Sequence, residues 1–132
     1  VVGVPCDKVQ RWVNLISPAN RDLPIIKCCG RLWSPVEILN ACLSNDPSFP
    51  RLEQILEAHG LGGDSPLNYN EITQARLERV FKNVHVLIGQ AGQSYVIGPE
   101  QLMQMIREGK GLGKRLQEAE LLTMIEELSK YG

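Results

Sequence analysis

SPVEILNACLSNDP, residues 34–47, carries the strongest local structural signal in the chain. Ser34 can accept a hydrogen bond from the free amides of a first helical turn, and Pro35 suits the first helical position because its missing N–H would be unpaired there. Glu37, three residues after the serine, completes a capping box. Apolar residues then follow at helical spacing until the turn signal at residues 45–47. The stretch therefore predicts a helix that begins after Ser34.

Helical patterns extend from this stretch in both directions. Proline or glycine stands next to most of the apolar stripes, where these residues begin or end helices. A glycine-rich break at residues 109–113 separates the last two patterns. Besides the helix after Ser34, helices are expected over residues 7–17, 50–59 and 70–88, from Pro99 to that break, and over residues 114–130.

Two further segments are harder to assign. Residues 23–33 continue a helical face, but the β-branched pair Ile25 and Ile26 also fits a short strand. Residues 89–98 (GQAGQSYVIG) are expected to form a loop, with an alternative in which residues 95–97 are extended. Because short connections join many helical patterns, we expect one all-α domain over residues 1–132, an orthogonal bundle of six or seven helices. The alternative is two helical subdomains joined by a hinge at residues 60–66 (GLGGDSP).

Composition bounds the function more than it identifies it. The 132 residues include 43% hydrophobic and 22% charged side chains, which is ordinary for a folded domain. Net charge is -1, so the chain lacks the basic excess of a dedicated nucleic-acid binder. No apolar stretch is long enough to cross a bilayer, and no signal pattern opens the chain.

The four cysteines are Cys6, Cys28, Cys29 and Cys42, and no CxxC pair occurs among them. A disulfide-stapled secreted domain is usually smaller and richer in cysteine. We therefore expect reduced thiols in an intracellular or virion-interior setting, with a disulfide framework as the alternative.

The most suggestive motif is GKGLGKR, residues 109–115. Glycine amides ahead of a helix N-terminus can hold an anion, so Lys110, Lys114 and Arg115 are candidate anion or nucleic-acid contacts. A P-loop requires a glycine where Glu108 stands and a serine or threonine where Arg115 stands. The alternative is a flexible joint between helices.

A second candidate surface comprises Tyr95, Val96 and Ile97 in the loop of small residues at 89–98. An exposed apolar tip there would mark a partner surface, whereas the alternative is a loop folded against the core. His59 and His85 lack other ligands at metal-binding spacing. No nucleophile–base motif occurs, so we expect no enzyme, no cofactor and no metal.

The first half also contains a more specific pattern. VQRWVNLI (residues 9–16), SPVEILN (34–40) and LEQIL (52–56) follow each other at similar spacing to the opening helices of retroviral Gag capsid N-terminal domains. The chain resembles that family over residues 9–57. The resemblance implies a viral or virus-derived structural protein that self-assembles through helices, and it implies no catalytic residues. The QGxxE…F…R motif of the capsid C-terminal domain is absent from the second half of the sequence.

Three functions follow in order of preference. The first is a structural, self-assembling or protein-interaction module. The second is a nucleic-acid-associated domain in which residues 110–115 converge with Arg76, Arg79 and Lys82. The third is an enzyme or small-ligand protein, which would require a deep pocket with convergent polar groups.

Overall fold

The computed structural model describes residues 6–132 and shows a mixed α/β fold. Within these residues, six α-helices are accompanied by two small sheets. The prediction of an all-α bundle is therefore wrong, although helix predominates. The helices are α1 (Cys6–Leu15), α2 (Pro35–Leu43), α3 (Phe49–Glu57), α4 (Tyr69–Phe81), α5 (Pro99–Glu108) and α6 (Leu112–Ser129), with short 3-10 helices η1 (Pro18–Asn20) and η2 (Pro66–Asn68). The strands are β1 (Ile26–Cys28), β2 (Arg31–Trp33), β3 (Gly62–Gly63), β4 (Val86–Gln90) and β5 (Gln93–Ile97).

The helix start at Ser34 is confirmed in atomic detail. The Ser34 hydroxyl accepts from the Glu37 amide at 3.2 Å, and the Glu37 carboxylate accepts from the Ser34 amide at 2.9 Å. Both halves of the capping box are therefore present, and Pro35 occupies the first turn. Such a cap stabilises a helix by about 1 kcal/mol, which explains why local sequence alone locates the start of α2.

Residues 26–33 form a β-hairpin, so a helix over residues 23–33 is wrong, and the alternative of a short strand is confirmed at Ile26. Strands β1 and β2 pair antiparallel with Ile26 opposite Trp33. Between them Cys29 and Gly30 both have positive φ, +58° and +81°. Two consecutive residues with positive φ define the tight turn that suits the twist of a hairpin, and they stop a helix from passing through. The β-branched Ile25 and Ile26 are fully buried at the other end of the hairpin, where Ile26 pairs with Trp33.

The segment predicted as a hinge, residues 60–66, contains strand β3. Gly63 pairs with Lys27 in a parallel register, and the Asp64 amide donates to the Lys27 carbonyl at 3.0 Å. The first sheet therefore has the strand order β2-β1-β3 and joins parts of the chain that lie far apart in sequence.

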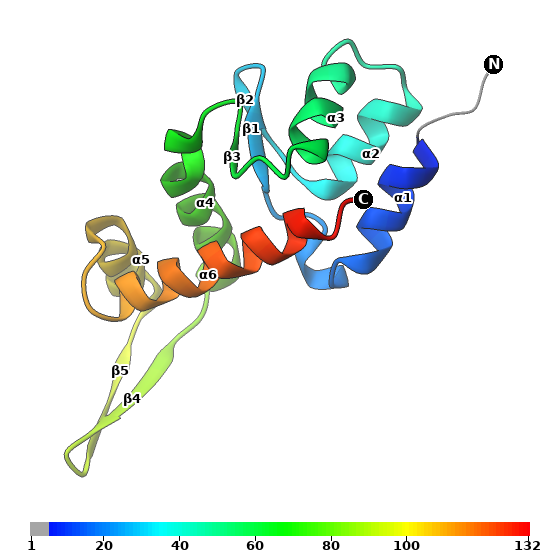
Figure 1. Cartoon of the computed structure of the whole chain (residues 1–132). Coiled ribbons are helices and arrows are strands. Elements are labelled where there is room, and N and C mark those ends of the chain that lie inside the picture. Colours follow the sequence, from blue (N-terminus) through cyan, green and yellow to red (C-terminus); the bar gives the residue numbers. More distant parts are fainter. Residues whose placement is uncertain (1–5) are drawn as a thin grey trace.

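A second hairpin replaces the C-terminal part of the long helix predicted over residues 70–88. Helix α4 ends at Phe81, and β4 then pairs antiparallel with β5. Ala91 and Gly92 form the turn, again with positive φ at both positions. The hairpin extends away from the helices at the lower left of Figure 1. The alternative of an extended piece at residues 95–97 is confirmed, because these residues belong to β5.

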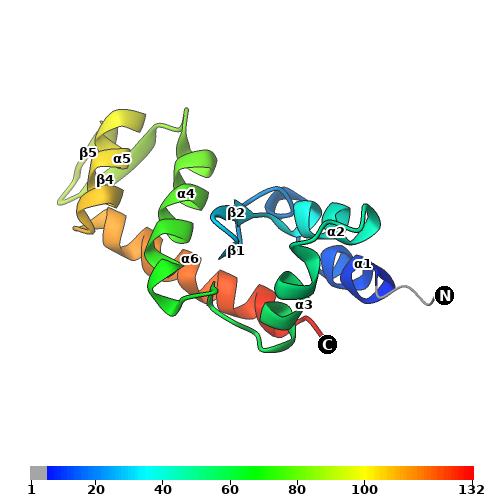
Figure 2. The same ribbon diagram turned by 90° about the horizontal axis from the view of Figure 1, so that it is seen from above.

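Two apolar clusters form the core, and α6 connects them. Figures 1 and 2 show α6 running from beside α5 to the region of α1 and α3. Near its end, Leu128 and the following Tyr131 enter the first cluster, while Leu112 and Leu116 pack against the second. The first cluster includes Val9, Trp12, Ile16, Ile25, Ile26, Ile38, Leu52 and Leu56, and the second is formed by Leu77, Ile97, Leu102 and Ile106.

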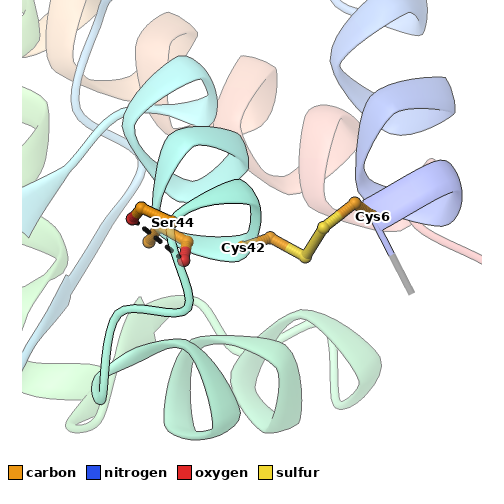
Figure 3. The surroundings of a disulfide bond; sticks show 4 residues. Cys6, Cys42 and Ser44 are labelled. Carbon is orange, nitrogen blue, oxygen red and sulfur yellow. Dashed lines mark hydrogen bonds between the residues drawn. A yellow bond between two sulfur atoms is a disulfide. The ribbon is translucent and has the colours of Figure 1, made fainter. Parts of the chain in front are cut away.

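A disulfide joins Cys6 of α1 to Cys42 of α2 across 36 residues (Figure 3). The expectation of reduced thiols is therefore wrong for these two cysteines. Both are buried, which the spacing of cysteines in the sequence could not reveal because the pairing depends on how α1 and α2 pack. Cys28 and Cys29 are free.

Removing this crosslink is expected to lower the free energy of unfolding by about 3–4 kcal/mol, because the disulfide restricts a loop of this length in the unfolded chain. The double variant Cys6→Ala/Cys42→Ala tests this by urea denaturation. Adding a reducing agent to the wild type should reproduce the loss and leave the variant unchanged. A reduced wild type as stable as the oxidised one would contradict the expectation.

Candidate interaction surface

The β4–β5 hairpin presents an apolar face to solvent. Leu87 and Val96 lie directly opposite each other in the register, so their side chains share one face. They are 70% and 58% exposed. On the other face Val86 packs against the second core cluster and Ile97 belongs to it. The hairpin is therefore anchored by one face at its base, and the other face has no covering element among the described residues.

The hairpin also lacks the features that usually protect sheet edges. No Asp, Glu, Lys or Arg occurs from Asn83 to Pro99, although such residues make up 22% of the chain. The sheet has only these two strands, so within residues 6–132 the outer edge of each is free to pair. Natural edge strands usually carry lysine, proline or a bulge that prevents pairing with another chain. An uncharged, proline-free hairpin is a template for strand addition.

The three residues predicted as a partner surface are separated by strand alternation. Val96 is exposed, and Tyr95, opposite Ile88, is half exposed. Ile97 is 2% exposed and lies in the second core cluster. Leu87 completes the outward face with Val96. Leu87 falls within the helix predicted over residues 70–88, and only a period of two between apolar residues could have shown its true position.

The basic residues at the α5–α6 joint do not converge with those on α4 as the nucleic-acid hypothesis required. Lys110, Lys114 and Arg115 are exposed. Lys114 lines a shallow hollow with Tyr69 and Thr73 near the start of α4. Arg79 and Lys82 instead line a different hollow with Arg107, toward the end of α4. Arg76 is completely buried and cannot reach a ligand at the surface.

Arg76 is the centre of a buried ion-pair network. Its guanidinium donates to the carboxylates of Glu120 and Glu127 on α6 and to the Pro24 carbonyl at 2.8 Å. The Glu127 carboxylate also accepts from the side-chain NH₂ group of Asn20 at 3.1 Å. Burial raises the pKa of Glu127 above its usual 4.5, against the opposing attraction of Arg76. The network holds α4 and α6 to the N-terminal half, a structural role for which the sequence around Arg76 carries no local signal.

Residues 6–132 contain no cluster of three or more His, Cys, Asp or Glu side chains that could hold a metal ion. Instead, Nε2 of His59 forms a hydrogen bond with the Tyr131 carbonyl at 2.8 Å, just after the C-terminal end of α6. Across the same described residues, no helix has both the length and the apolar character needed to cross a bilayer.

Comparison with protein-family models, with curated proteins and with solved structures finds no match for this chain. The viral capsid role implied by the resemblance of residues 9–57 therefore has no support beyond that resemblance.

Proposed function

We propose that this chain is a non-enzymatic assembly module that associates with a second copy of itself through the β4–β5 hairpin. The observation that carries the proposal is the outward pair Leu87 and Val96 on an uncharged sheet with two free edges. A two-stranded sheet is marginal in water, and pairing with further strands stabilises it.

A second copy fits this surface for a physical reason. Two identical hairpins related by a twofold axis place the same uncharged strand against itself, so no like charges meet in the interface. The resulting four-stranded sheet would pair the free edge groups and join the Leu87 and Val96 side chains of both copies into one apolar face, in which the side chains beside the new edge contact each other. A strongly charged partner would gain no electrostatic complementarity from residues 83–99, which carry no formal charge apart from any on His85.

The double variant Leu87→Lys/Val96→Lys is expected to weaken self-association about 100-fold. Partial burial of these four side chains, two from each copy, contributes on the order of 3 kcal/mol, and each 1.4 kcal/mol changes a dissociation constant tenfold. Light scattering coupled to size exclusion measures the mass across protein concentration. Because the association is apolar, the wild-type mass should rise with concentration at both low and high salt.

The matched control is Leu67→Lys on η2. Leu67 is 84% exposed and lies outside both core clusters, so its variant should associate like the wild type. A wild-type protein that stays monomeric at every concentration would refute the proposal. The proposal would also be refuted if the mass of the double variant rose with concentration as much as that of the wild type.

A further inference from the structure

The two free cysteines lie side by side at the tip of the β1–β2 hairpin. Their Sγ atoms are 2.7 Å apart. Neighbouring residues of a strand normally point to opposite faces of a sheet. Here the positive φ of Cys29 turns its side chain back toward that of Cys28. The turn itself therefore creates the pair of thiols.

Cysteine is an unusual choice for this turn position. Asn, Asp and Gly dominate two-residue turns in which both residues have positive φ, because they tolerate that conformation. Gly30 follows this rule and Cys29 departs from it. Cys29 is also exposed, so it fills no space in the core. Neither turn geometry nor packing accounts for a thiol at this position.

The two thiols differ in their surroundings. Cys28 is fully buried, and its carbonyl accepts from the Trp33 indole at 3.0 Å. Two effects raise the pKa of the Cys28 thiol to about 12: burial is the larger, and the hydrogen bond with Cys29 is the next. Cys28 therefore stays protonated at neutral pH. Cys29 meets solvent and is the thiol that a dissolved reagent can reach.

We propose that Cys28 and Cys29 form an oxidation site, a vicinal dithiol that a peroxide converts to an intramolecular disulfide. In the first step the Cys29 thiolate attacks a peroxide oxygen, an S–O bond forms, the O–O bond breaks, and hydroxide leaves. In the second step the Cys28 sulfur attacks the Cys29 sulfenic acid, the S–S bond forms, and the S–O bond breaks. The Cys28 proton leaves with the hydroxyl group as water. Two thiols are oxidised by two electrons, and hydrogen peroxide is reduced to two molecules of water.

A disulfide between Cys28 and Cys29 closes a small ring that includes the peptide bond between them. Closing it changes the conformation of the turn, and Trp33 lies close enough for its fluorescence to report the change. Its indole is bonded to the Cys28 carbonyl, and the Arg31 guanidinium lies 3.9 Å from the centre of its ring. In the variant Trp12→Phe, Trp33 is the only tryptophan of the chain. Its emission is expected to shift when peroxide is added and to return when a dithiol reductant follows.

The sequence offers a direct assay, because trypsin cuts after Lys27 and after Arg31 and releases both cysteines in one peptide, CCGR. Cys6 and Cys42 fall in other peptides. The wild-type protein is treated with hydrogen peroxide, its remaining thiols are alkylated, the protein is digested with trypsin, and mass spectrometry measures the mass of the peptide. We expect the doubly alkylated peptide to be lost and replaced by one that lacks two hydrogen atoms and carries no alkyl group.

Two variants provide controls. Cys29→Gly suits the positive φ and should fold, and its single thiol should form no internal disulfide. Cys28→Ala should leave Cys29 to oxidise beyond the sulfenic acid or to link two molecules. Phenylarsine oxide, which bridges two adjacent thiols, should capture the reduced wild type, with capture lost in both variants. Peroxide that drives wild-type Cys29 to sulfinic acid, or links two wild-type chains, without forming the closed peptide would overturn the proposal.

Discussion

Replacing Arg76 with methionine is expected to lower the free energy of unfolding by about 3–5 kcal/mol. Methionine fills much of the space of the arginine stem but leaves Glu120 and Glu127 without their cation. The Glu127 side chain is only 5% exposed, so water cannot replace the lost partner. The Pro24 carbonyl also loses its donor. Urea denaturation at neutral pH, monitored by tryptophan fluorescence, measures the loss of stability.

Arg79→Met is the matched control on the same helix. Arg79 is exposed and makes a single described hydrogen bond, to the Asp22 carbonyl at 2.8 Å, so its replacement should change stability by less than about 1 kcal/mol. Adding Glu120→Gln and Glu127→Gln to Arg76→Met should recover much of the loss, because no buried charge then remains. Equal losses for Arg76→Met and Arg79→Met would show that the network does not stabilise the fold.

The same network makes stability depend on pH. Because the folded pKa of Glu127 is raised above 4.5, the folded chain keeps a proton that the unfolded chain has released in the window just above that value. Ionisation of Glu127 therefore costs stability as pH rises through this window. Without Arg76 the pKa should rise further. We expect the difference in stability between Arg76→Met and the wild type to shrink as pH falls from neutral to about 5.

The parts of the fold that could be predicted from sequence are those with local causes. The start of α2 can be predicted from four residues, because the capping box and its proline comprise Ser34, Pro35 and Glu37. Gly109, with φ of +65°, ends α5 where the glycine-rich break was expected. These signals depend on hydrogen bonds between near neighbours, so no knowledge of tertiary structure is needed to interpret them.

Both hairpins were missed because their turns use unusual residues. Cys29 and Ala91 have positive φ, a conformation for which neither residue type is a recognised signal. An apolar stripe then reads as a helix up to Ile88, although Val84, Val86 and Ile88 also alternate with a period of two. Propensity alone does not decide between the two patterns in so short a run.

The candidate surface and the buried network could not be predicted because they depend on contacts between distant residues. Arg76 and Glu120 are 44 residues apart, and Arg76 was assigned to a surface because charged residues usually lie there. The place of Leu87 on a strand follows from the end of α4 at Phe81, and its exposure follows from the pairing of β4 with β5, which turns it to the outward face.

Gly63→Ala is expected to lower the free energy of unfolding by about 4 kcal/mol. Gly63 has φ of +82°, and an added Cβ would collide with the Lys27 carbonyl and lie 2.7 Å from the Lys27 amide nitrogen. The collision is with backbone, so no side chain can move aside, and β3 must separate from β1. Overpacking contributes about 1–3 kcal/mol, and the strain of positive φ adds roughly 1–2 kcal/mol.

Gly30→Ala separates these two causes. Gly30 has nearly the same φ, +81°, but no atom lies within 4 Å of the position its Cβ would take. It should lose only about 1 kcal/mol, because the strain is partly offset by the lower entropy of the unfolded alanine chain. Urea denaturation compares the two variants, and hydrogen exchange at the Asp64 amide reports the β1–β3 pairing directly. Faster exchange in Gly63→Ala alone would show that close backbone contact, and not φ, requires glycine at residue 63; equal losses in both variants would assign the requirement to φ.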